Sequence, residues 1–216
     1  MAIRGAIFDM DGTLTDSMHL WIEIGKRYLS SLGYEVSPEQ NRMLTSMLLE
    51  PMSVYMIEEF GLEKSPEEIV ADMNKMVEQG YFEEVLVKPT VKEALQELQD
   101  RGVPMVVATA TDRYLTEACL KRNGIDRYFS AIFTCGEEHC SKRVPQIYDK
   151  ARAFLETAPE ETWIFEDTYI SLTGAKKSGC RVMAVRDRWS EKHADEIKAL
   201  ADGYVDRMGD IDFDSL

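Results

Sequence analysis

Short apolar runs separated by longer amphipathic stretches dominate the pattern along this chain. Five runs predict buried strands, because each is almost continuously apolar and is bounded by polar residues or glycine: residues 3–8, 105–109, 131–134, 163–166 and 182–185. Helical periodicity follows at residues 112–123, 144–156 and 168–178, and Gly124 and Gly179 mark two of the helix ends. This alternation predicts an α/β fold, a Rossmann-like parallel sheet with helices on both faces.

The interval between the first two predicted strands is too long for one crossover helix and predicts an inserted all-helical domain. Ser37 and Ser65 each precede a proline, and an amide or acid follows three residues after each serine, which is the pattern of a capping box. A similar pattern at Thr90 predicts the start of the helix that returns to the sheet. We therefore expect an α/β core of residues 1–14 plus 88–216 and a helical cap of residues 15–87.

Methionine is concentrated in this predicted cap, which holds seven of the twelve: Met18, Met43, Met47, Met52, Met56, Met73 and Met76. Methionine suits adaptable apolar binding surfaces, but it also fills the cores of small helical domains. We favour core packing.

The formal net charge of −14 restricts the classes of partner. Such a chain repels nucleic acid and anionic membranes over most of its surface, and no apolar run is long enough to span a bilayer. A phosphorylated ligand would need a locally positive site. The N-terminal residues show no signal-peptide pattern and the four cysteines are scattered, so we expect cytoplasmic residence. Cys135, His139 and Cys140 match no common zinc spacing and are interpreted as an ordinary loop.

Candidate chemistry begins directly after the first predicted strand. Asp9 and Asp11 are separated by one residue, and Gly12 permits the sharp turn that would point both carboxylates into one crevice. The carboxyl ends of parallel strands are where ligands bind in such sheets. The alternative is structural, because acids after a strand also serve as helix caps.

Three further strand ends carry complementary groups. Thr109 ends the second strand, Lys142 lies in the loop after the third, and Glu166 and Asp167 follow the fourth. Taken singly, these are a capping threonine, a solvated lysine and an acid pair at a helix N-terminus. Together they predict a hard-oxygen pocket for Mg²⁺, with threonine and lysine placed to hold a phosphoryl group.

These residues, in this order, resemble the four motifs of the haloacid dehalogenase superfamily. Asp9-Met10-Asp11-Gly12-Thr13-Leu14 is similar to the first motif, and the resemblance extends over the whole chain, including a helical cap inserted after that motif. The chain looks most like the subgroup that contains phosphoglycolate phosphatases and β-phosphoglucomutases.

The resemblance implies a role for each candidate residue. Asp9 would attack phosphorus, and Asp11, initially protonated, would act as general acid and then as general base. Mg²⁺ would take the carboxylates of Asp9 and Asp167 and the backbone carbonyl of Asp11, with Glu166 supporting a bound water. Phosphate oxygens would be held by Thr109 and the amide of Ala110, and Lys142 would offset charge on the transferring group. The cap would close over the site, hinging near residues 15–16 and 88–89.

The predicted function is Mg²⁺-dependent hydrolysis of a small-molecule phosphate monoester through an aspartyl-phosphate. Asp11 argues against carbon–halogen or carbon–phosphorus cleavage, because relatives with those activities lack an acid there. Residues 45–50 lack the arginine that similar mutases present to a second phosphate, so a β-phosphoglucomutase-like mutase is the alternative. A non-catalytic binding protein is a second alternative.

Other expectations concern the surroundings of the site. Asp112 is interpreted as a helix cap and Arg113 as a candidate substrate contact. Lys142 is followed by Arg143-Val144-Pro145, whereas many relatives have proline directly after the lysine, so the path of this loop is not predicted. We expect a monomer without nucleic-acid or membrane partners.

Overall fold

A computed structural model describes residues 2–216 of the chain. The chain divides into two compact units, one made of Met1–Asp16 with Val85–Leu216 and the other of Ser17–Glu84. Within the described residues, no helix combines the length and the apolar character that a membrane span needs. The two units are described in turn.

The larger unit contains a six-stranded parallel sheet with strand order β3-β2-β1-β4-β5-β6. Its strands are β1 (Gly5–Phe8), β2 (Met105–Thr109), β3 (Ala131–Thr134), β4 (Thr162–Glu166), β5 (Arg181–Val185) and β6 (Gly203–Val205). In the register of the sheet, Ile7 of β1 lies opposite Val106 on one side and Ile164 on the other. The prediction of a Rossmann-like α/β sheet is confirmed.

Strand β6 is missing from the prediction. It has three residues, begins with glycine and is only partly buried, so its side chains form no continuous apolar run. It is held by its pairing with β5, where Met183 lies opposite Gly203. A contact between distant segments, rather than local composition, therefore defines this strand.

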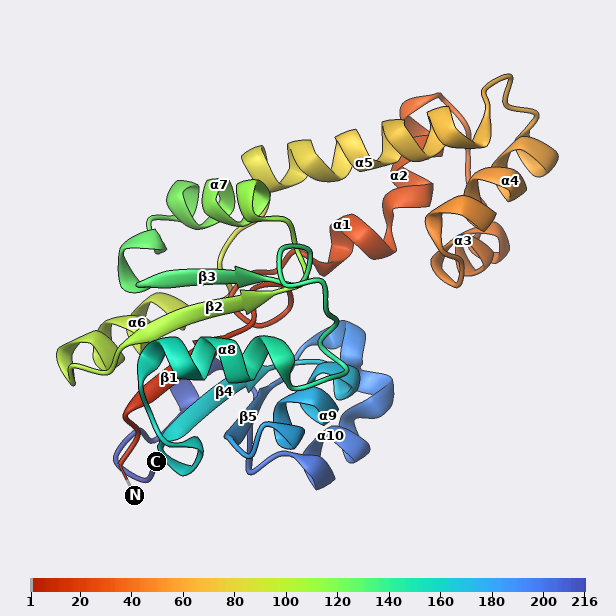
Figure 1. Cartoon of the computed structure of the whole chain (residues 1–216). Coiled ribbons are helices and arrows are strands. Elements are labelled where there is room, and N and C mark those ends of the chain that lie inside the picture. The colour runs from red at the N-terminus through yellow and green to blue at the C-terminus, as the bar shows by residue number, and fades with distance from the viewer. Residues whose placement is uncertain (1) are drawn as a thin grey trace. The chain divides into compact units, whose positions relative to one another are not determined.

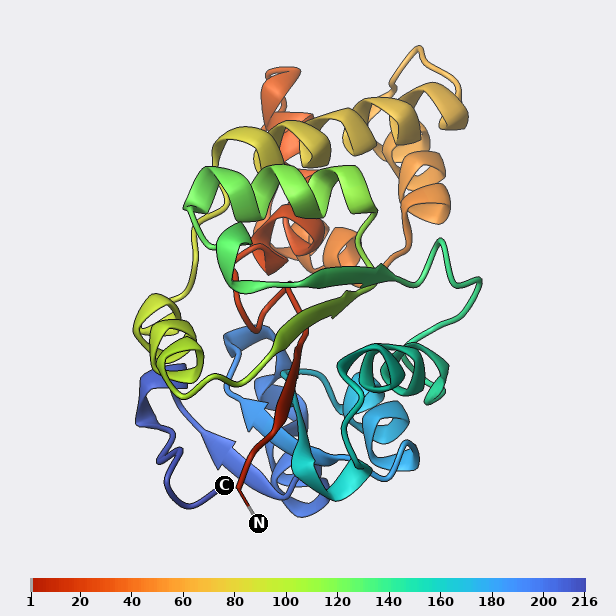
Figure 2. The same ribbon diagram turned by 60° about the vertical axis from the view of Figure 1, so that its left-hand side comes forward.

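Helices cover both faces of this sheet (Figures 1 and 2). They are α6 (Val91–Asp100), α7 (Arg113–Asn123), α8 (Gln146–Leu155), α9 (Tyr169–Lys177) and α10 (Ala194–Leu200), with short 3₁₀ turns η1 (Asp126–Tyr128), η2 (Pro159–Glu161), η3 (Arg188–His193) and η4 (Met208–Asp210). From β1 the chain adds β2 and β3 toward one edge of the sheet, and then returns to add β4, β5 and β6 toward the other edge. Right-handed crossovers therefore place α6 and α7 on one face and α8, α9 and α10 on the other.

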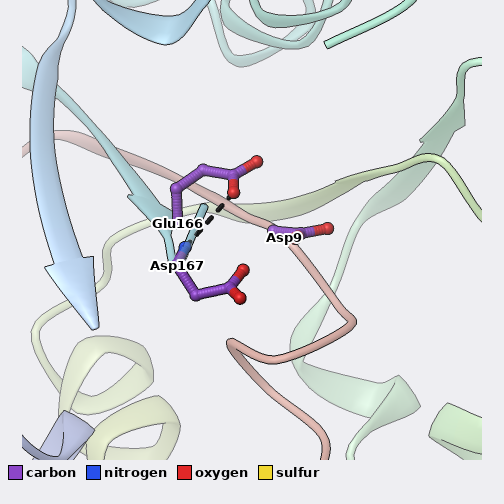
Figure 3. Close-up of side chains that lie close together, drawn as sticks. All are labelled: Asp9, Glu166 and Asp167. Atoms are coloured by element: carbon purple, nitrogen blue, oxygen red, sulfur yellow. Dashed lines mark hydrogen bonds between the residues drawn. The ribbon is translucent and has the colours of Figure 1, made fainter. Parts of the chain in front are cut away.

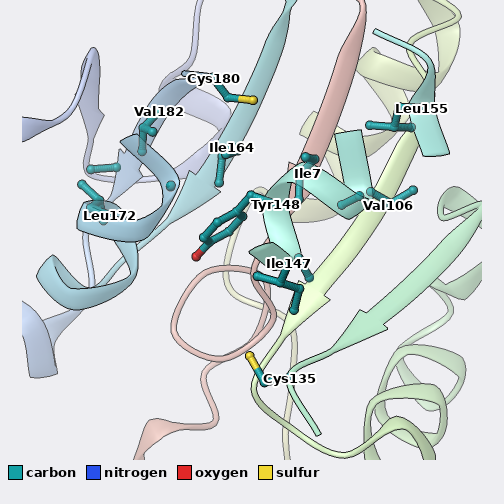
Figure 4. Close-up of a cluster of buried hydrophobic side chains, with 14 of the residues drawn as sticks. Ile7, Val106, Cys135, Ile147, Tyr148, Leu155, Ile164, Leu172, Cys180 and Val182 are labelled. Carbon is teal, nitrogen blue, oxygen red and sulfur yellow. The ribbon is translucent and has the colours of Figure 1, made fainter. Parts of the chain in front are cut away.

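The core under α8, α9 and α10 is a cluster of buried side chains from both layers (Figure 4). Ile7, Val106 and Ile164 come from the central strands, and Tyr148 and Leu172 come from the covering helices. Because alternate strand residues face opposite sides, Phe8 and Phe165 stack on the other face with ring centroids 4.4 Å apart. The two central strands are thereby fixed on both faces next to their carboxyl ends.

The smaller unit is entirely helical. Its helices are α1 (Met18–Ile22), α2 (Ile24–Ser31), α3 (Pro38–Thr45), α4 (Leu49–Phe60) and α5 (Pro66–Glu83). The capping boxes predicted at Ser37 and Ser65 are both present, each with reciprocal side-chain and backbone hydrogen bonds. Among its methionines, Met52, Met56 and Met73 are fully buried, which accords with core packing, whereas Met43 is exposed.

Two predicted helix caps are wrong in detail. Thr90 precedes α6 with φ of 67° rather than in the extended conformation of a capping box, and its hydroxyl accepts a hydrogen bond from the Gly209 amide at 2.8 Å. Asp112 does occupy the position before α7, but its side chain makes no capping hydrogen bond. For Thr90, a tertiary contact with Gly209 rather than the local helix decides where the side chain points.

Candidate active site

The site is built where the strand order reverses, between the carboxyl ends of β1 and β4. In parallel sheets of this order, ligands bind in the crevice at this point, because loops leave the two strands in opposite directions. The Asp9 amide donates to the Phe165 carbonyl at 3.0 Å, which ties the end of β1 to the end of β4. Asp9 and Asp167 therefore emerge side by side from neighbouring strands.

The turn after Asp9 brings the first loop against Asp167. Gly12 adopts φ of 82°, a conformation that favours glycine, and the Asp167 carboxylate occupies the space that a Gly12 side chain would need. The Thr13 hydroxyl donates to Asp167 Oδ1 at 3.3 Å. A side chain at position 12 would displace Asp167, so the glycine is needed both for the turn and for this close approach.

The end of β2 contacts the first loop through hydroxyl groups. Thr111 Oγ1 donates to Asp11 Oδ2 at 2.7 Å, and the Thr111 amide donates to the hydroxyl of the fully buried Thr109 at 3.1 Å. Ala110, between them, is exposed. Thr111 was not among the predicted site residues, because a threonine next to a capping position carries no signal of its own in the sequence.

Lys142 reaches the same place from the loop after β3. Its ammonium group forms ion pairs with the Asp9 carboxylate and, at 2.6 Å, with Glu166 Oε1, and the lysine is 8% exposed. The Tyr148 hydroxyl of α8 also donates to Glu166 Oε1, at 2.9 Å. Glu166 is completely buried and was predicted to support a bound water; in this structure its carboxylate is held directly by lysine and tyrosine.

Asp9, Glu166 and Asp167 form a compact acidic cluster (Figure 3). One carboxylate oxygen from each lies within 4.8 Å of the others, and all three residues are buried. When all are ionised, these three carboxylates and the ammonium of Lys142 leave two uncompensated negative charges. Hard oxygen ligands with this excess of negative charge fit a divalent cation.

The pKa values reflect this crowding. Burial, followed by the charge of Glu166, raises the pKa of Asp9 well above its usual value, although Lys142 opposes the shift. Burial and then the charge of Asp9 raise the pKa of Asp167 in the same way. Burial alone would lower the pKa of Lys142, but the charges of Asp9 and Glu166 outweigh it and raise the pKa, which keeps the lysine cationic.

Arg113, the candidate substrate contact, is bonded elsewhere. Its guanidinium donates to both carboxylate oxygens of Glu137, at 2.6 and 2.7 Å, and to the Ile132 carbonyl at 2.8 Å. None of these partners belongs to the acidic cluster. A substrate role for Arg113 stays a prediction, and it would have to compete with this bidentate ion pair.

Comparison with known proteins places this geometry in a family. Residues 6–185 match the sequence profile described as haloacid dehalogenase-like hydrolase, which spans most of the chain and includes all of the strand ends above. The chain belongs to the haloacid dehalogenase-like hydrolases. The family predicted from the motifs is confirmed.

Individual relatives in this family are similar over nearly the whole chain. The pyrophosphatase PpaX of Bacillus mycoides (strain KBAB4) is 27% identical over 212 residues, which cover 98% of this chain and 96% of that protein. A phosphorylated carbohydrates phosphatase of Thermotoga maritima is 24% identical over 177 residues, or 82% of each protein. A crystal structure from Thermotoga maritima, provisionally assigned as a beta-phosphoglucomutase, superposes with a TM-score of 0.84. The sequence identity is 23% and the superposition covers 95% of each chain, so the two proteins share the fold.

Proposed function

We propose that this haloacid dehalogenase-like hydrolase is a Mg²⁺-dependent phosphatase that cleaves a small-molecule phosphate monoester through an aspartyl-phosphate on Asp9. The observation that carries the proposal is the position of the Asp9 carboxylate. It is buried at the point where the strand order reverses, next to Asp167 and in an ion pair with Lys142. A carboxylate held in this way has a cation on one side and an acidic cluster that fits a metal on the other.

Each residue around Asp9 has a separate role in the proposed phosphoryl transfer. Asp9 would form the bond to phosphorus, while Lys142 would balance charge on the equatorial oxygens. Asp167 would hold the metal with Asp9 and the Asp11 carbonyl, and Mg²⁺ when bound would reduce the repulsion between carboxylate and phosphate. The Thr109 hydroxyl and the Ala110 amide would bind phosphate oxygens at the start of the loop that leads to α7.

Asp11 is suited to proton transfer. It is only partly buried, and Thr111 fixes its carboxylate through one oxygen. The other oxygen would protonate the leaving oxygen of the substrate and later deprotonate the attacking water. We propose that the helical unit Ser17–Glu84 serves as a cap that limits access of water and substrate during this cycle.

Pyrophosphate is a second candidate substrate, because the pyrophosphatase PpaX is 27% identical over nearly the full length of both chains. Breaking a phosphoanhydride needs the same nucleophile and metal, but the leaving group is itself a phosphate and needs no protonation by Asp11. Asp11→Asn should slow hydrolysis of the aspartyl-phosphate with either substrate, because that step needs the general base in both cases. Its formation, measured as the burst of leaving group in a single turnover, should be slowed far more with an alkyl phosphate than with pyrophosphate. The mutase alternative remains less favoured, because residues 45–50 contain no arginine.

The decisive experiment measures Mg²⁺-dependent phosphate release from p-nitrophenyl phosphate, pyrophosphate and a panel of phosphorylated metabolites. Asp9→Asn should abolish turnover and leave the melting temperature within a few degrees of the wild type. Asp126→Asn, at an exposed aspartate in η1, is the matched control and should retain full activity.

Two results would point away from a phosphatase. Conversion of β-glucose 1-phosphate into glucose 6-phosphate, without free phosphate, would indicate a mutase. Wild-type turnover no faster than that of Asp9→Asn on every substrate would favour the non-catalytic alternative. The expected monomeric state and cytoplasmic location stay predictions.

A further inference from the structure

Lys88 joins two catalytic loops from outside the acidic cluster. Its ammonium group donates hydrogen bonds to the Gly12 carbonyl at 2.5 Å, to the Arg186 carbonyl at 2.7 Å and to Asp187 Oδ2 at 3.1 Å. An ammonium group has three donors, so all of them are used. The side chain is 16% exposed, which makes these bonds stronger than those of a solvated surface lysine.

The first of these bonds fixes the turn after β1. The Gly12 amide donates a hydrogen bond to the Thr15 carbonyl at 2.9 Å, and the Gly12 carbonyl accepts one from Lys88. Both backbone polar groups of Gly12 are therefore held by hydrogen bonds. Because the Asp167 carboxylate lies against the α-carbon of Gly12, movement of this peptide would change the spacing between Asp11 and Asp167.

The other two bonds fix the loop after β5. Asp187 is 4% exposed; one of its carboxylate oxygens accepts from the Trp189 amide at 2.9 Å and the other from Lys88. Ser190, in the same loop, donates to Asp167 Oδ2 at 3.5 Å. The two loops that Lys88 joins therefore contact Asp167 from two directions.

We infer that Lys88 is a positioning residue for phosphoryl transfer, which holds the Gly12 turn against the loop after β5 so that Asp11 and Asp167 keep their spacing. This inference rests on the proposed phosphatase activity. Lys88 touches neither the reacting oxygens nor the acidic cluster through any of its hydrogen bonds, so its effect is transmitted through the Gly12 peptide and through Asp187.

Substitution of Lys88 tests this role. Lys88→Met keeps a long side chain of similar shape but removes all three donors. We expect kcat to fall roughly 10- to 100-fold with little change in KM, because a shift approaching 1 Å in catalytic groups affects the transition state more than substrate binding. Lys92→Met is the matched control, since Lys92 is exposed on α6 only four residues away, and its kcat should equal that of the wild type.

Two further variants separate positioning from general loss of stability. Lys88→Ala should regain part of its kcat when n-propylammonium is added, which matches the three carbons and the ammonium group that the substitution removes, because Lys88 lines a surface cavity of about 260 Å³ that a small amine can enter. Asp187→Asn combined with Lys88→Met tests whether the lysine acts only by neutralising Asp187. The double variant should remain as slow as Lys88→Met, because the bond to Gly12 is still absent.

A readout independent of turnover distinguishes failure of this inference from failure of the proposed function. In ¹H–¹⁵N spectra, Lys88→Met should shift the Gly12 amide signal and speed its hydrogen exchange at least tenfold, whereas Lys92→Met should do neither. If the wild type hydrolyses no phosphate compound, the proposed function fails and the spectra alone decide whether Lys88 fixes the turn. An active wild type with unchanged kcat in Lys88→Met, full recovery in the double variant, or no amine rescue would overturn the inference.

Discussion

Replacing Gly174 by alanine tests how the Lys142 loop is held in place. Gly174 is buried in α9, and a Cβ atom added to it would lie 2.9 Å from the Lys142 carbonyl carbon and 3.0 Å from that of Arg143, with the Lys142 oxygen nearer still. Ordinary contact begins at 3.4 Å. Since the obstacle is backbone, no rotamer change can relieve it, and either α9 or the Lys142 loop must move.

The size of the effect follows from that distance. Clearing the oxygen as well as the carbon needs a shift on the order of 1 Å. Overpacking of this kind costs about 1–3 kcal/mol, and the higher helix propensity of alanine returns up to ~1 kcal/mol of it. We expect a net loss of about 1–2 kcal/mol, which lowers the melting temperature of a protein of this size by about 3–6 °C.

Activity should fall further than stability. A displacement near 1 Å at Lys142 would weaken its ion pair with Asp9 and reduce kcat by roughly 100-fold. The assay is phosphate release under saturating substrate and Mg²⁺, together with thermal unfolding of each variant. Gly136→Ala is the control, because Gly136 lies in the same loop and its added Cβ would come no closer than 3.5 Å to a neighbouring group, the Asp112 carboxylate. A Gly174→Ala protein with wild-type melting temperature and kcat would refute the reasoning.

Three other substitutions or conditions give separate tests. Lys142→Met should lower kcat by roughly 100- to 1,000-fold and destabilise the metal-free protein by about 3–5 kcal/mol, measured by urea unfolding, because it leaves buried carboxylates unpaired. The raised pKa values of Asp9 and Asp167 mean that these groups stabilise the metal-free fold at acidic pH and that this stability is lost as the pH rises through their folded pKa values. Mg²⁺ should accordingly raise the melting temperature more at pH 8 than at pH 5.5, and an equal increase at both would contradict the assignment of the ligands. Burial raises the pKa of the Cys119 and Cys135 thiols to about 11, so their alkylation by iodoacetamide in the folded protein should accelerate about tenfold per pH unit between pH 7 and 10; a plateau near pH 8.5 would show ordinary, exposed thiols.

Local sequence patterns were sufficient for those parts of the fold that local chemistry determines. The serine caps at Ser37 and Ser65 form as predicted, because serine, proline and the acid or amide lie within one helical turn. The similar pattern at Thr90, which has valine in place of proline, did not form a capping box, because the Gly209 amide donates a hydrogen bond to the threonine hydroxyl and the backbone takes a left-handed conformation. No local pattern contains that competing partner.

In the candidate site, too, local sequence predicted some features and tertiary contacts determine the others. Strand ends could be located from apolar runs, and acids at those ends predicted that Asp9 and Asp167 would meet. The direct bonds of Glu166 to Lys142 and Tyr148 could not be predicted, because they depend on how a loop and a helix approach the end of β4 in three dimensions. Lys88 was expected only to lie in a hinge at residues 88–89. Its bonds to the two loops could not be predicted, since an isolated lysine before a proline has no distinguishing neighbours in the sequence.

The central place of β1 has a consequence for how the protein is made. This strand leaves the ribosome before either of its neighbours, β2 and β4, which begin at Met105 and Thr162. The helices of Ser17–Glu84 form a compact unit of their own and can fold while β1 still lacks its neighbouring strands. Cation affinity should consequently be absent from the nascent chain until Asp167 has left the ribosome, because the carboxylates cannot assemble before then.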